Sequence, residues 1–110
     1  MINNMEEDQL YPSLVNNLEK DFAFEKQLLP AQNDLTIIRL HLINRVKQLM
    51  ARDYQRFLNS LYQIDVNEKK VREIIHSKNK TTIPERLADL IIERQLQRVK
   101  TQMLYRNSKI

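Results

Sequence analysis

Residues 34–64 read DLTIIRLHLINRVKQLMARDYQRFLNSLYQI and contain neither glycine nor proline. Their apolar side chains recur at steps of three and four, the spacing that places them on one face of an α-helix. Asn33 or Asp34 is a suitable cap for the start of this segment. We expect either a single helix of about 30 residues, about 45 Å long, or two helices divided near Asp53.

The rest of the 110-residue chain also lacks glycine, of which average usage would supply about eight residues. Glycine provides the positive-φ corners of tight hairpins and phosphate-binding loops, so its absence favours helices joined by short polar links. The sequence therefore predicts an all-α single domain, residues 1–110, built as a bundle of about four helices. We expect one long central helix and one long C-terminal helix. Residues 1–9 would form an acidic tail, which is a candidate for a flexible segment.

Upstream of the central segment, apolar residues follow helical spacing from Leu10 to Leu29. Pro12 suits an early turn of such a helix, and Ser13 is the alternative, as the cap of a later start. The residue before a proline is disfavoured in a helix, so we expect this element to close at Pro30.

Downstream, two segments have the pattern of a capping box, in which a small polar or acidic residue stands three positions before a glutamate. The first, DVNE at residues 65–68, predicts a short helix capped by Asp65. The second, TIPE at residues 82–85, predicts a helix that continues to about Tyr105. Proline in the first turn of that helix is harmless, because the N–H group it lacks would have no partner within the helix.

This last helix does not keep one apolar face throughout. At about 100° per residue, one side carries Ile83, Leu87, Leu90 and Ile91, and the opposite side carries Ala88, Ile92, Leu96, Val99 and Met103. We predict a partner interface at Ile91, Ile92, Leu96, Val99 and Met103. Two alternatives are a solvated helix face with no partner, and an anion-binding or nucleic-acid-binding surface at Arg94, Arg98, Lys100, Tyr105, Arg106 and Lys109.

Charge is divided unevenly along the chain, whose formal net charge is +4. Residues 1–34 hold seven acids and two lysines, whereas residues 35–110 hold sixteen bases and seven acids. Two interpretations follow: an acidic first segment lies on a basic body, or a basic surface meets an anionic partner.

Residues 52–57 interleave bases and aromatic residues, a pattern found on some nucleic-acid-binding surfaces. A helix explains the same pattern more simply. On this helix Arg52, Asp53 and Arg56 would face water, and the residues that pack inward would be Tyr54, Phe57, Leu58 and Leu61.

Several classes of chemistry are excluded by missing residue types. Without cysteine there is no disulfide, thiolate zinc site or cysteine nucleophile, and without glycine there is no P-loop, dinucleotide-binding fingerprint or nucleophile elbow. No run approaches the roughly 18 apolar residues of a membrane span. With 42% hydrophobic and 29% charged residues, the composition predicts a globular protein, which we expect in the cytoplasm without a membrane partner.

Two histidines are the remaining candidates for a metal or catalytic site. Glu73 and His76 form the Glu-x-x-His step of di-iron bundles, but such sites need two steps and further glutamates. His41 has Ile38 where a second step would need an acid. We therefore expect no metal, no cofactor and no enzymatic activity.

Two runs, FLNSLYQIDV at residues 57–66 and ADLIIERQ at residues 88–95, are similar to stretches in short, uncharacterised helical proteins of bacteria. The resemblance implies a bacterial cytosolic setting and carries over no active site. Taken with the helix pattern, the function we expect is a non-enzymatic protein-interaction or assembly subunit. It would bind another protein or form a homodimer, and nucleic-acid or anion binding is the alternative.

Overall fold

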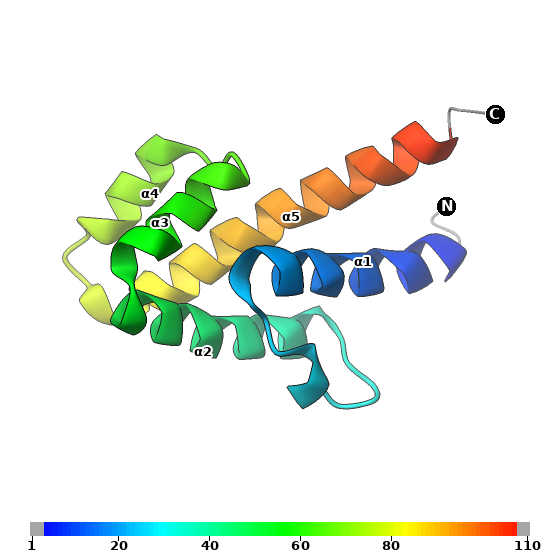
Figure 1. Ribbon diagram of the computed structural model, residues 1–110, viewed down its shortest axis with the longest axis horizontal. Coiled ribbons are helices and arrows are strands. Elements are labelled where there is room, and N and C mark those ends of the chain that lie inside the picture. Colours follow the sequence, from blue (N-terminus) through cyan, green and yellow to red (C-terminus); the bar gives the residue numbers. More distant parts are fainter. Residues whose placement is uncertain (1–3, 108–110) are drawn as a thin grey trace.

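The computed structural model describes residues 4–107, which form an all-α fold, as expected from the sequence (Figure 1). Five α-helices follow one another within this part of the chain: α1 (Asn4–Phe22), α2 (Leu35–Arg52), α3 (Tyr54–Gln63), α4 (Glu68–Ile75) and α5 (Ile83–Asn107). Single 3-10 turns at Lys26–Leu28 and Lys80–Thr82 lie in the links. Helix α1 begins inside the acidic segment 1–9, and residues 1–3 of that segment lie outside the described residues.

Helix α5 organises the bundle. Its 25 residues correspond to about 37 Å of helix, most of the 47 Å length of the molecule. It packs against α2 and α1, and α4 packs on its first half, while α3 packs against α2 and α1 (Figure 1). The core between these helices consists of buried apolar side chains from every helix, among them Leu18, Leu42, Phe57, Val71 and Ile91.

The long central segment is divided at Asp53, so the two-helix alternative is the one observed. Asp53 leaves the helical conformation, with φ −153° and ψ 86°, and its N–H still donates to Leu49 at the end of α2. Its carboxylate then accepts from the backbone N–H of Arg56 at 3.1 Å and caps α3. The turn lets Phe57 and Leu61 enter the core beside α1 and α2. Asp34 caps α2 in the same way by accepting from Ile37.

The capping-box prediction at residues 65–68 is wrong about its cap. Asp65 has a positive φ of 63° and ends α3 instead. Its N–H donates to Tyr62 at 3.0 Å and that of Val66 donates to Leu61 at 3.4 Å, the bond pattern of a Schellman motif. Helix α4 therefore starts later, and the side chain of Asn67 caps it by accepting from Lys70.

The start of α5 is predicted correctly, but another residue provides the capping oxygen. Asn79 accepts from the N–H of Thr81 and caps a 3-10 turn that leads directly into α5 at Ile83. The hydroxyl of Thr82 donates back to the carbonyl of Asn79 at 3.1 Å.

The first apolar series overestimates the length of α1, which ends at Phe22 and not near Pro30. Ala23 takes a positive φ of 51°, and this turn directs Phe24 into the core. Leu28 lies in the following 3-10 turn and is exposed. At the other end, α1 starts at Asn4, so Pro12 lies inside the helix and Ser13 is not its cap.

Candidate functional site

The second half of α5, residues 94–107, carries most of the residues singled out from the sequence. Of the five predicted interface residues, Ile91, Ile92 and Val99 are buried in the protein's own interior. Leu96 and Met103 are only partly buried. A partner that binds the folded chain can therefore reach only these last two.

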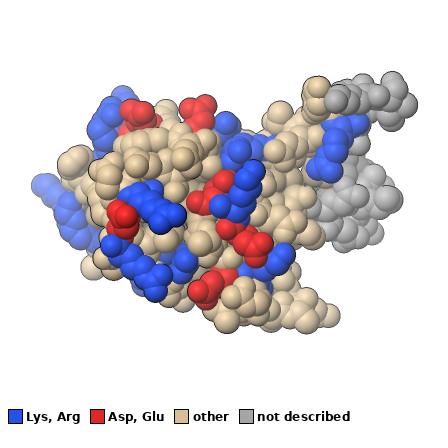
Figure 2. All heavy atoms as spheres, in the orientation of Figure 1, with Lys and Arg blue, Asp and Glu red and all other residues tan. Residues whose placement is uncertain are grey.

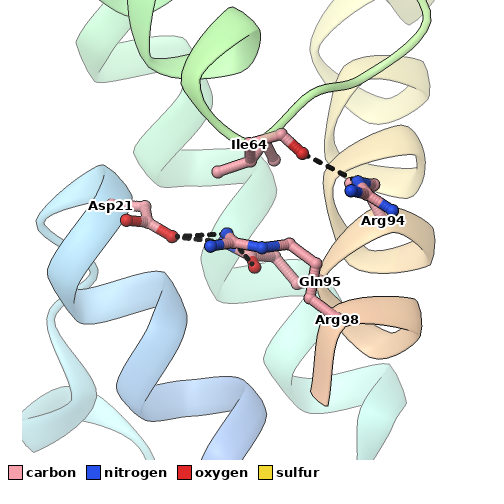
Figure 3. A network of polar contacts seen from close by, with 5 residues as sticks. All are labelled: Asp21, Ile64, Arg94, Gln95 and Arg98. Carbon is pink, nitrogen blue, oxygen red and sulfur yellow. Dashed lines mark hydrogen bonds and ion pairs between the residues drawn. The ribbon is translucent and has the colours of Figure 1, made fainter. Parts of the chain in front are cut away.

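Arg98 and Asp21 bring the acidic first third of the chain onto the basic last helix. One guanidinium nitrogen of Arg98, Nη1, lies 3.2 Å from Oδ2 of Asp21, near the end of α1 (Figure 3). The Asp21 and Arg98 side chains are 21% and 33% exposed, so water only partly screens the pair. A second pair of the same kind joins Glu25 to Arg45 on α2 at 3.7 Å. Both pairs support the intramolecular interpretation of the uneven charge.

Gln95 completes this contact and was missed by the sequence analysis. It is fully buried, its Nε2 donates to Asp21 at 2.8 Å, and its Oε1 accepts from Arg98 at 3.0 Å (Figure 3). The signal that could have found it is its spacing, four residues after buried Ile91 and four before buried Val99. A polar residue in the middle of an apolar helix face requires a buried partner.

Arg94 fixes α5 to the end of α3. Its Nε donates to the backbone carbonyl of Ile64 at 2.7 Å (Figure 3). Ile64 directly precedes the positive-φ residue Asp65. Its Nη2 also lies 3.9 Å from the exposed carboxylate of Asp65. Arg94 and Arg98, the first two cations of the predicted anion surface, are thus both bonded within the chain.

The remaining members of that surface are distributed over the end of α5. Lys100, Tyr105 and Arg106 are exposed, and Lys109 lies outside the described residues. Acidic and basic side chains are interleaved over the face seen in Figure 2, which has no continuous basic stripe along α5.

The histidines lie on different elements, with His41 on α2 and His76 at the C-terminal cap of α4. Among residues 10–106, whose side chains the structure describes, no group of three or more histidine, aspartate or glutamate residues could hold a metal ion. Across the same residues, none of the helices is both long and apolar enough to cross a membrane.

Tyr54 at the start of α3 is 38% exposed, so the prediction that it packs inward with Phe57 is wrong. Partial burial, and secondly the charge that Tyr62 acquires on ionisation, raise the pKa of Tyr54. Tyr54 and Tyr62 are both partly exposed and lie on the same side of α3, eight residues apart.

Comparison with protein-family models, curated proteins and solved structures gives no match to the chain. The resemblance of residues 57–66 and 88–95 to helical bacterial proteins stays a prediction.

Proposed function

We propose that this protein is a non-enzymatic interaction or assembly subunit that self-associates through the C-terminal end of α5. The observation that carries the proposal is the exposure of Leu104, which is 70% accessible to solvent near the end of a 25-residue helix. A partner that covered this side chain would remove its apolar surface from water, which is favourable.

The end of α5 lies beyond the packed part of the bundle. The last buried residue described on this helix is Val99, and between residues 100 and 106 only Met103 is partly buried. In Figure 1 this end of α5 runs past α2 and α3 and has α1 as its neighbour. Met103 and Leu104 therefore add apolar surface next to the core without being enclosed by it.

A second copy of the chain is the partner we propose. Two-fold dimers are the commonest closed assemblies, and in them the same patch lies on both sides of the interface. Leu104 of each copy would then contact the α5 end of the other. Lys100 and Arg106 would lie at the rim, where water still solvates their charges.

The alternative, nucleic-acid binding by the same helix, has less support. Arg94 and Arg98 already donate to Ile64, Asp21 and Gln95. A phosphate backbone would have to be bound by cations that remain, such as Lys100 and Arg106, and few contacts mean weak binding. A bacterial, cytoplasmic setting is part of the proposal and comes from the sequence.

Light scattering over a dilution series tests self-association. We expect a dimer at high concentration that dissociates on dilution, and we expect Leu104→Ser to weaken it about tenfold or more. Leu40→Ser is the matched control, because Leu40 is a 56% exposed leucine in the middle of α2. A strict monomer at high concentration would contradict the proposal.

A further inference from the structure

A groove of about 530 Å³ lies between the end of α1, the second half of α2 and α3. Its volume falls in the range of sites that hold small molecules, about 300–1,000 Å³. Phe57 and Leu49 form part of its wall and lie close to the core. The groove is distant in sequence from the end of α5 and shares none of its lining with residues 100–107.

Three cations from three helices line this groove without a partner in the described part of the chain. They are Lys20 on α1, Arg52 at the end of α2 and Arg56 on α3. A fourth cation, Arg45, already has partners within the chain. Its guanidinium donates to the backbone carbonyl of Phe22 and to the side chain of Gln48, and its Nη1 lies 3.7 Å from the carboxylate of Glu25. Like charges held in one groove repel one another unless an anion lies between them.

Asp21 and Asp53 line the groove but form no ion pair with these three cations among the described residues. Asp21 accepts from Gln95 and Arg98 on α5. Asp53 accepts from the backbone N–H of Arg56, as the cap of α3. Neither carboxylate is within ion-pair distance of the Lys20, Arg52 or Arg56 side chain among the contacts of the described residues. The three cations are therefore free of ion pairs within the described residues, while Asp21 and Asp53 have hydrogen-bond donors of their own.

We propose that this groove binds the phosphate group of a small phosphorylated ligand. Arginine donates in a planar fork that matches phosphate oxygens, and charge-assisted hydrogen bonds of this kind are strong. Asn59 adds a neutral donor, because its oxygen already accepts from Gln55 and its amide hydrogens remain for a ligand. The side chain of Gln63 lines the same groove.

The limited extent of the groove favours a small ligand over a polynucleotide. A nucleic-acid strand is held by a continuous positive track along its backbone. Here Asp21 and Asp53 line the groove with the cations, and acids are interleaved with bases over the face seen in Figure 2.

The test uses the full chain at low ionic strength, with inorganic pyrophosphate as the probe and backbone amide NMR shifts as the readout. We expect saturable shifts at Arg52, Arg56 and Asn59. The double variant Arg52→Gln/Arg56→Gln should weaken binding about tenfold or more. Arg86→Gln is the matched control, since Arg86 is an exposed arginine on α5 outside the groove, and it should change the affinity less than twofold.

Three outcomes would overturn the proposal. These are shifts that do not saturate with pyrophosphate, an affinity that the double variant leaves unchanged, and a ten-nucleotide RNA that binds when pyrophosphate does not. If the double variant fails to fold, as judged by circular dichroism, Lys20→Gln replaces it with an expected loss of about fivefold or more. Dimerisation is measured separately, so its failure leaves this result interpretable.

Discussion

Asp21 and Arg98 lie 77 residues apart in the chain, yet the carboxylate of one is 3.2 Å from the guanidinium of the other. Buried Gln95 bonds to both of them. The contact fixes the end of α1 on the middle of α5, so the uneven charge of the sequence serves the packing of the chain on itself. The two binding surfaces that we propose lie elsewhere, at the end of α5 and in the groove beside α3.

Replacing Gln95 by leucine should destabilise the fold. The change keeps a similar volume but leaves Asp21 and Arg98 each without one buried hydrogen bond. We expect the free energy of unfolding in urea to fall by about 1–3 kcal/mol. The control is Gln102→Leu at an exposed position of the same helix, where the change should be within about 0.5 kcal/mol. A Gln95→Leu protein as stable as the parent would contradict this role.

Asp65 occupies a backbone conformation that glycine adopts more easily. Its φ of 63° ends α3, and a Cβ atom is unfavourable there. We expect Asp65→Gly to be more stable than Asp65→Ala by about 1 kcal/mol in thermal or urea unfolding. Both variants lose the same carboxylate, so the difference reports the backbone alone. Equal stability of the two would mean that this turn is not strained.

The cap at Asp53 should contribute measurably to stability. Asp53→Ala removes the oxygen that accepts from Arg56, and we expect a loss of about 1 kcal/mol. Asp53→Asn retains an accepting oxygen while removing the charge, so its effect should be less than half as large. Urea unfolding of the two variants separates the cap from the charge. An equal loss in both would assign the effect to the charge.

Tyr54 should titrate above the ordinary range of tyrosine. Tyr62→Phe removes the second cause of the raised pKa, so it should lower the pKa of Tyr54 in a titration followed by ultraviolet absorbance. Because the folded state favours the neutral phenol, the associated stability is present below the unfolded pKa of about 10 and is lost as the pH rises through the folded pKa. A Tyr54 pKa unchanged by Tyr62→Phe would rule out the interaction.

The helices were predictable from the sequence because each rests on local signals. The spacing of apolar residues in 34–64, the missing glycine and the cap at Asp34 all act within a few residues. The errors arose where two local signals compete. Residues 65–68 satisfy the pattern of a capping box, but Asp65 ends α3 instead of starting α4. The turn at Asp65 places Val66 in the core, where it is bonded through its N–H to the carbonyl of buried Leu61.

The candidate sites were less predictable, because they depend on residues that meet only in space. Arg94 and Arg98 are exposed basic residues on a helical wheel, and only the fold supplies their acceptors at Ile64 and Asp21. Arg52 and Arg56 were expected to face water, and they do. Nothing in their spacing brings Lys20 to the same groove.

The contact between two copies at the α5 end can be measured by single-cysteine cross-linking, since the chain has no cysteine of its own. Leu104→Cys is oxidised mildly at a concentration where the parent protein is dimeric, with Leu40→Cys as the exposed control. We predict that Leu104→Cys forms a disulfide-linked dimer at least tenfold faster than Leu40→Cys. Equal rates for the two variants, or no linked dimer from Leu104→Cys, would contradict self-association through this helix end.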